Sequence, residues 1–271
     1  MKNWKVLATS ILVGTLCMSS AKAVEISSED YNRLRNVFSD ARISVMTEEE
    51  VNKYLSYDLE NTITEDVYYK GVSRNNESYT WTEVSEEEYE AVDPNIMPAA
   101  TEVSTNYKRL AISATPLSGG TYSFYEVASW KYMPAVRSYD VIAFRFRNVA
   151  ILTNSQSGLQ AYKRAGDSAF SSIGYGPNGT NISKQDAGFG ISMNLVDLSI
   201  DAIELSLSAE GMVSGSDPYV YGAYQHAIQG VTLAQSKDYT ISGAGFGNVV
   251  NFSPTQQNKF DGMRGVEISL K

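Results

Sequence analysis

The amino-acid sequence predicts a mainly β protein, an antiparallel β-sandwich preceded by a small α/β unit at the N-terminus. Three observations predict this fold class. Beyond about residue 101, apolar residues recur at alternate positions, which is the period of a strand with one buried face. Clusters of Gly, Pro, Asn or Ser separate most of these segments and are typical of turns. Patterns that begin helices are confined to the N-terminal third.

Residues 24–92 are predicted to form the small helix-and-strand unit. Ser28 precedes apolar residues whose spacing of three and four places them on one helical face, and its hydroxyl would cap the first turn. Thr47 and Glu50 have the spacing of a capping box. Ser85 begins a third short helix. Two extended stretches rich in Tyr, Val, Thr and Trp lie between these helices, at 66–72 and 78–84.

A proline-containing segment, 93–100, is predicted to be the linker between this unit and a β-sandwich domain at 101–271. Proline pushes the residue before it toward extended geometry and interrupts regular structure. Nine strands are expected after the linker, each half-buried with one face in water. They are 110–114, 122–130, 142–146, 191–195, 203–209, 220–228, 239–242, 249–252 and 266–270.

The first 23 residues have the pattern of a secretory signal peptide. Lys2 and Lys5 precede an apolar run at 6–18, and Ala21-Lys22-Ala23 is a typical cleavage site. The apolar run is shorter than the roughly 20 residues that span a bilayer, so no transmembrane segment is expected. Cleavage after Ala23 would remove the sole cysteine, Cys17, which excludes disulfides, a thiol nucleophile and cysteine-based zinc sites.

The charge balance excludes nucleic acid as an expected partner. The whole chain has 22 basic and 31 acidic residues and a formal charge of −9; cleavage removes three lysines and leaves 19 basic residues and a charge of −12. Phosphate binding requires a basic surface. A secreted, extracellular location fits this acidic chain.

No residue is predicted to be catalytic, and no cofactor or metal site is expected. Gly174, Gly176 and Gly179 have the GxGxxG spacing but lack the strand and helix of a nucleotide site. His226 is the sole histidine, and we expect a structural role for it. A triad of His226 with Asp140 and Ser138 is an alternative that no GxSxG motif supports.

Aromatic and charged residues near predicted loops are the candidate binding residues, because aromatic faces stack on sugar rings. They are Trp130, Tyr132, Arg137, Tyr139, Asp140 and His226. Arg137 and Asp140 are also expected to form a charge pair that fixes a chain corner. The partners expected for such residues are a glycan, the cell wall or an extracellular protein.

Three segments resemble a group of uncharacterised secreted proteins of Gram-positive bacteria. They are WKYMPAVRSYDVI at 130–142, YQHA at 224–227 and KFDGMRGV at 259–266. The resemblance extends over most of the mature chain. It implies export and a similar organisation, and it supplies no activity because the group has none assigned.

The sequence therefore predicts an exported extracellular protein that acts as a non-catalytic binding or interaction module at the cell surface or in the medium. One alternative is a glycan or cell-wall hydrolase that uses paired carboxylates. Another is a β-pore-forming toxin, for which 203–210 is the best candidate strand.

Overall fold

The computed structural model describes residues 24–74, 79–93, 103–197, 199–242, 249–262 and 265–271. The predicted signal peptide and all of the predicted linker except Asp93 lie outside these residues. The strands are β1 Ile63–Arg74, β2 Thr80–Val84, β3 Val103–Pro116, β4 Thr121–Trp130, β5 Tyr139–Arg147, β6 Val149–Ile151, β7 Ser157–Arg164, β8 Ser171–Tyr175, β9 Ile182–Gln185, β10 Gly188–Asn194, β11 Ile200–Val213, β12 Tyr219–Gln225, β13 Tyr239–Ile241, β14 Val250–Phe252 and β15 Val266–Ser269.

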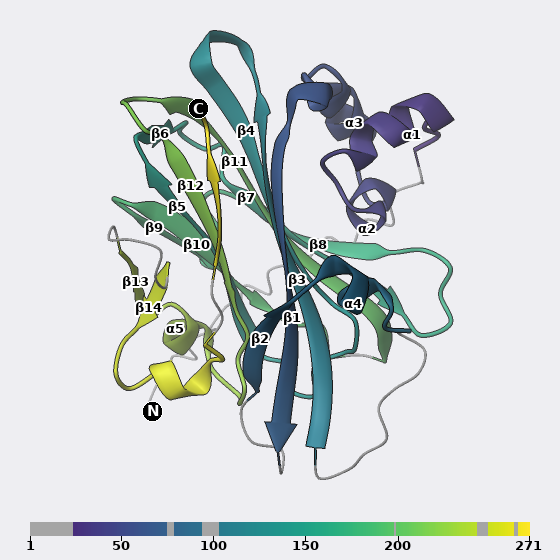
Figure 1. The fold of residues 1–271 in the computed structure, drawn as a ribbon, viewed down its shortest axis with the longest axis vertical. Coiled ribbons are helices and arrows are strands. Elements are labelled where there is room, and N and C mark those ends of the chain that lie inside the picture. The colour runs from purple at the N-terminus through teal and green to yellow at the C-terminus, as the bar shows by residue number, and fades with distance from the viewer. Residues whose placement is uncertain (1–23, 75–78, 94–102, 198, 243–248, 263–264) are drawn as a thin grey trace, which may run out of the picture.

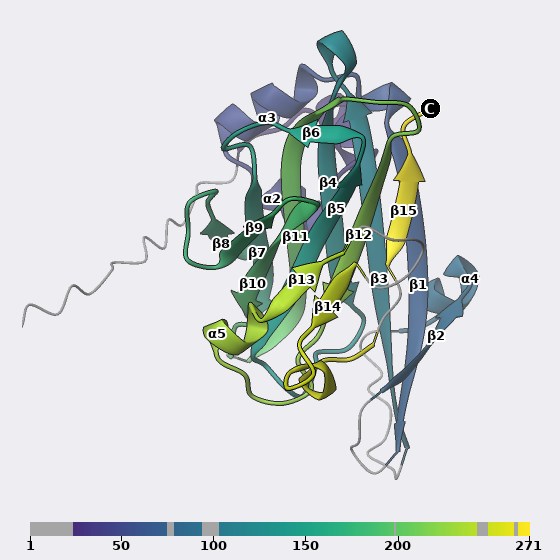
Figure 2. The same cartoon turned by 90° about the vertical axis from the view of Figure 1, so that its left-hand side faces the viewer.

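All the described strands except β13 and β14 form two antiparallel sheets that pack face to face as a sandwich (Figures 1 and 2). The larger, eight-stranded sheet has the order β2-β1-β3-β4-β11-β7-β8, with β6 paired to β11. The smaller, five-stranded sheet has the order β15-β12-β5-β10-β9, and β13 pairs with β14 in a separate ribbon. The predicted fold class, a mainly β protein built as an antiparallel sandwich, is confirmed, and the region before β1 is helical.

The core between the sheets is filled by apolar side chains from alternate strand positions. Phe124 of β4, Phe144 of β5 and Phe189 of β10 are almost completely buried there, together with Leu205 of β11. Complete burial of such a side chain contributes roughly 1.5–3 kcal/mol relative to its exposed state. The alternation that predicted the strands therefore also identified the inner faces.

The helices are α1 Ser28–Arg35, α2 Asp40–Ser44, α3 Glu48–Leu55, α4 Glu86–Glu90 and α5 Leu233–Ser236, with short 3-10 turns η1 Leu59–Asn61, η2 Ser118–Gly120 and η3 Gln257–Lys259. Ser27, one residue before the predicted position, caps α1. Thr47 and Glu50 form the predicted capping box at α3, and Ser85 caps α4.

Helices α1 to α3 cover the outer face of the larger sheet (Figure 1). Phe38 packs edge-on against Tyr125 of β4, with a centroid separation of 4.9 Å. This packing corrects the expectation that strand 203–209 has one face in water, because Glu204 and Ser206 on that face are 7% and 3% exposed.

The outer face of the smaller sheet is also covered. Helix α5 and strands β13 and β14 lie on the side opposite α1 to α3 (Figures 1 and 2), and an apolar cluster joins the two strands to β5. Arg145 of β5, expected to be in water, is 2% exposed, and its guanidinium lies 4.0 Å from the ring centroid of Tyr221.

The predicted unit at 24–92 is continuous with the larger sheet. Strand β1 pairs with β3 along its whole length, from Ile63 opposite Ala114 to Arg74 opposite Val103. Strands β6 to β9 were not predicted, because they are short or rich in polar residues and glycine. Gly174 of the GxGxxG pattern lies in β8, which pairs with β7.

Candidate functional site

The structure places the predicted binding residues in different environments. Trp130, Asp140 and His226 are 6%, 0% and 3% exposed and lie together in the interior. Tyr132 and Arg137 line a surface groove. Tyr139, at the start of β5, is partly buried against the apolar cluster that joins β5 to β13 and β14.

The interior residues belong to a charged cluster, which we define as Lys108, Asp140, His226 and Asp261. Lys108 comes from β3 of the larger sheet, Asp140 from β5 of the smaller sheet, and His226 follows β12. Asp261 lies between η3 and β15. All four residues are at most 3% exposed, so the two sheets hold the cluster between them.

Asp140 fixes the position of His226. Its carboxylate lies 2.9 and 3.0 Å from Nδ1 of His226 and accepts a hydrogen bond of 2.9 Å from the backbone N–H of Ala227. The carboxylate also accepts a hydrogen bond from the hydroxyl of Tyr224. The oxygen of that hydroxyl accepts a hydrogen bond of 3.0 Å from Nε1–H of Trp130. Burial raises the pKa of the Tyr224 hydroxyl well above its usual value, and the Asp140 carboxylate adds to this effect.

This arrangement corrects two expectations about residues near Asp140. Arg137 donates from Nη1 to the carbonyl of Val196, while Asp140 bonds to His226, Ala227 and Tyr224 instead of the expected guanidinium. Ser138 donates to the carbonyl of Val231 and accepts from its N–H, at 3.0 and 2.8 Å. Its hydroxyl is therefore engaged with Val231, which does not support the triad alternative.

The loop groove is a surface hollow of about 960 Å³. It lies where the segment after β4 meets the ends of β7 and β11. Its lining residues combine aromatic, cationic and acidic side chains and are 131–135, Arg137, Lys163, Phe170, Asp197 and 200–202.

Contacts hold the side chains on one wall of the loop groove. Lys131 pairs with Glu90 at 3.2 Å, and its amine lies 4.3 Å from the ring centroid of Tyr89. The Tyr132 hydroxyl donates to the carbonyl of Asp93 at 3.2 Å. This wall is therefore ordered by helix α4 and the residues that follow it.

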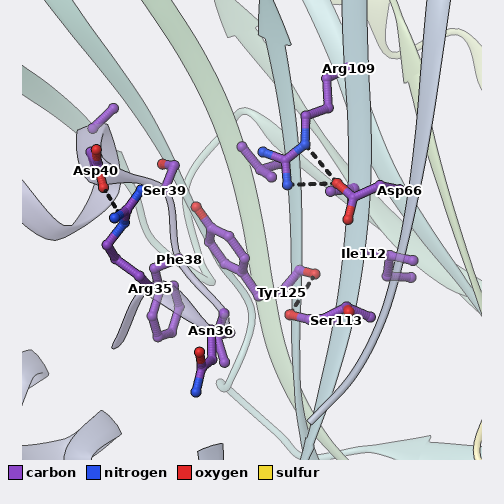
Figure 3. A pocket seen from close by; sticks show the side chains of 15 residues that line it. Arg35, Asn36, Phe38, Ser39, Asp40, Asp66, Arg109, Ile112, Ser113 and Tyr125 are labelled. Carbon is purple, nitrogen blue, oxygen red and sulfur yellow. Dashed lines mark hydrogen bonds and ion pairs between the residues drawn. The ribbon is translucent and has the colours of Figure 1, made fainter. Parts of the chain in front are cut away.

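The helix–sheet cavity, of about 510 Å³, lies between residues 35–41 and the outer faces of β1, β3 and β4. Figure 3 shows two ion pairs on its walls, Arg109 with Asp66 at 2.6 Å and Arg35 with Asp40 at 2.9 Å. Burial raises the pKa of the Tyr125 hydroxyl, which is also on the wall.

Glu204 lies behind this cavity. The hydroxyl of Ser39, a lining residue, donates to Oε1 of Glu204 at 2.5 Å. Burial raises the pKa of the Glu204 carboxyl to about 7, although the Ser39 hydrogen bond and the charges of Arg109 and Arg42 act in the opposite direction. A carboxyl with this pKa exchanges protons near neutrality, but Glu204 is not itself among the lining residues.

Comparisons with known proteins find no matching family model and no matching curated protein. Solved structures give distant likenesses. The pilus backbone protein RrgB from Streptococcus pneumoniae is 10% identical, with a TM-score of 0.25, over 40% of this chain and 25% of that chain. The KRT10-binding region domain of the pneumococcal serine-rich repeat protein PsrP is 14% identical, with a TM-score of 0.27, over 71% of this chain and 99% of that chain.

Among the described residues, no helix has the length and apolar character needed to cross a membrane. No group of three or more His, Cys, Asp or Glu residues among them has an arrangement that would hold a metal ion.

Sequence reasoning missed Lys108, Asp261 and Glu204. A signal for Lys108 was present, since it shares strand parity with Leu110 and Ile112 and therefore faces the core. Asp261 lies in the segment 259–266, one of the three whose sequence resembles a group of secreted proteins. No local pattern indicated Glu204, because its burial depends on helices distant in the sequence.

Proposed function

We propose that the chain is an exported binding module that acts outside the cell, and that the loop groove holds its ligand. The observation that carries this proposal is the groove itself, whose volume of about 960 Å³ is within the range of ligand sites and whose walls combine apolar and polar groups.

The ligand class that fits the groove best is a glycan. Tyr132 and Phe170 provide aromatic surfaces on which sugar rings stack. Arg137, Lys163 and Asp201 provide donors and acceptors for hydroxyl and acidic groups around those rings. The signal peptide predicted from the sequence supports a location where such glycans occur.

A hydrolase is the alternative for the same groove, because Asp197 and Asp201 both line it. Glycoside hydrolysis requires two carboxyl groups on opposite sides of the bond that is cleaved. Binding is favoured because the groove presents Tyr132 and Phe170 as stacking surfaces.

The test measures binding of residues 24–271 to purified bacterial cell wall and to a glycan array, with release of reducing sugar followed in parallel. We expect saturable binding without product. Tyr132→Ala and Arg137→Ala should each weaken binding about tenfold or more, which corresponds to about 1.4 kcal/mol. Arg35→Ala, at a guanidinium in the helix–sheet cavity, is the matched control and should leave binding unchanged.

Three results would contradict the proposal. Product release that depends on Asp197 and Asp201 would identify a hydrolase. Glycan binding that both groove variants leave intact would place the ligand site elsewhere. Absence of glycan binding, together with binding to an extracellular protein, would change the class of ligand.

A further inference from the structure

The amine of Lys108 is enclosed by aromatic rings in the interior. Its Nζ lies 3.9 Å from the ring centroid of Trp81, 4.1 Å from that of Trp130 and 5.2 Å from that of Tyr224. Burial lowers the pKa of the amine, although the Asp261 and Asp140 carboxylates act in the opposite direction. Burial therefore favours an uncharged amine, whose nitrogen lone pair is nucleophilic.

The carboxyl group of Asp261 is in direct contact with this amine. Oδ2 contacts Nζ of Lys108, and the exposed fractions of the two side chains are 0% and 1%. The other oxygen, Oδ1, accepts the backbone N–H of His226 at 2.8 Å. In this position the His226 N–H polarises the carboxyl carbon of Asp261 and stabilises the negative charge that develops on Oδ1 when the amine attacks.

Asp140 keeps the backbone N–H of His226 in position and is the second buried carboxyl group of the charged cluster. Its contacts with Nδ1 of His226 and with the N–H of Ala227 hold the chain where the His226 N–H meets Asp261. The side chains of Lys108, Asp140 and Asp261 are thus enclosed together, where burial of charge is costly.

We propose that Lys108 and Asp261 condense to form an intramolecular amide between Nζ and Cγ, with release of one water molecule. Proton transfer within the ion pair gives an amine and a carboxylic acid. The nitrogen lone pair attacks Cγ, one N–H proton passes to the hydroxyl that leaves, and the C–O bond breaks. The atoms balance, and no oxidant, reductant or other reactant is required.

Such a bond would join the two sheets of the sandwich. Lys108 is in the middle of β3 in the larger sheet, and Asp261 precedes β15 at the edge of the smaller sheet. The two residues are 153 positions apart, so the amide would close a loop over more than half of the chain.

The test measures the intact mass of residues 24–271 under denaturing conditions. We expect a mass that is lower than the sequence mass by one water molecule. Protease digestion should then give a branched peptide that joins the segment of Lys108 to the segment of Asp261. A folded protein whose mass equals the sequence mass, with the two segments in separate peptides, would show an ion pair only and overturn the proposal.

Variants separate this amide from another loss of water, because the Asp261-Gly262 sequence can also cyclise on its own backbone to a succinimide. Lys108→Met should abolish the mass deficit, whereas a succinimide would persist and overturn the proposal. Lys53→Met, at a half-exposed lysine that pairs with Glu210, is the matched control and should keep the deficit. If Lys108→Met does not fold, the branched peptide of the unsubstituted protein decides the question.

Discussion

Lys108 and Arg109 are neighbours on β3, and each pairs with an aspartate on a different face of the larger sheet. Lys108 faces inward, where its side chain and that of Asp261 are 1% and 0% exposed. Arg109 faces the helix–sheet cavity, where its side chain and that of Asp66 are 32% and 30% exposed. The same type of pair is therefore enclosed on one face of the sheet and partly hydrated on the other, and burial sets its energetics and chemistry.

The largest effect is expected from breaking the inner pair. Lys108→Met leaves the Asp261 carboxylate buried without its partner and should reduce the free energy of unfolding by about 3–5 kcal/mol, measured by urea denaturation. The double variant Lys108→Met/Asp261→Leu removes both charges. It should recover most of that loss if the residues form an ion pair alone, because paired apolar replacement of a buried pair is often close to neutral.

The double variant also sharpens the inference of an amide. A covalent link across 153 residues would additionally restrict the unfolded chain, by an amount comparable with the ~4.7 kcal/mol that a disulfide closing a loop of 100 residues provides. The double variant would then remain several kcal/mol less stable than the linked protein.

A smaller effect, an increase in the free energy of unfolding, is expected from a substitution of Glu204 behind the helix–sheet cavity. The pKa of Glu204 is about 7 when folded, above its ordinary value of 4.5. The folded protein therefore binds this proton more tightly than the unfolded chain, so its stabilising contribution is complete below pH 4.5 and is lost as the pH rises through 7. The change in unfolding free energy caused by Glu204→Gln should therefore be more favourable at pH 8 than at pH 4, by about 1–3 kcal/mol.

The pH profile of that variant provides its own control. The same stabilisation at pH 4 and pH 8 would show that the change acts through packing around Ser39 and not through ionisation. Loss of stability at both values would show that the Gln side chain does not reproduce the packing and hydrogen bonding of the Glu204 carboxyl group, whatever its ionisation.

The smallest effect is expected from the outer pair. Arg109→Ala should reduce the unfolding free energy by about 1 kcal/mol or less, and the reduction should shrink at high salt, because hydrated pairs are screened. It should also raise the pKa of Glu204, since Arg109 acts to lower it. A loss as large as that of Lys108→Met would remove the distinction between the two faces.

The alternation of residues along the strands was enough to predict which charged side chains face the interior of the sandwich. Lys108 lies on the same strand face as Leu110 and Ile112, and Asp140 lies on the same face as Ile142 and Phe144. Both charged residues could therefore be assigned to inner faces of the sandwich. Which charges meet could not be predicted, because Lys108 and Asp261 are 153 residues apart and only tertiary packing brings them together. The covering of Glu204 was missed because α2 has five residues and a weak pattern.

The separation of Lys108 and Asp261 along the chain also bears on when the Lys108 amine meets its counter-charge. During synthesis or export from the N-terminus, β3 emerges long before the segment that holds Asp261. Until that segment arrives, the amine of Lys108 has no inward counter-charge from it, and the inner face of β3 retains a hydrated cation. The segment that contains Asp261 therefore supplies the counter-charge with which the Lys108 amine is buried, 153 residues after the strand that carries this lysine.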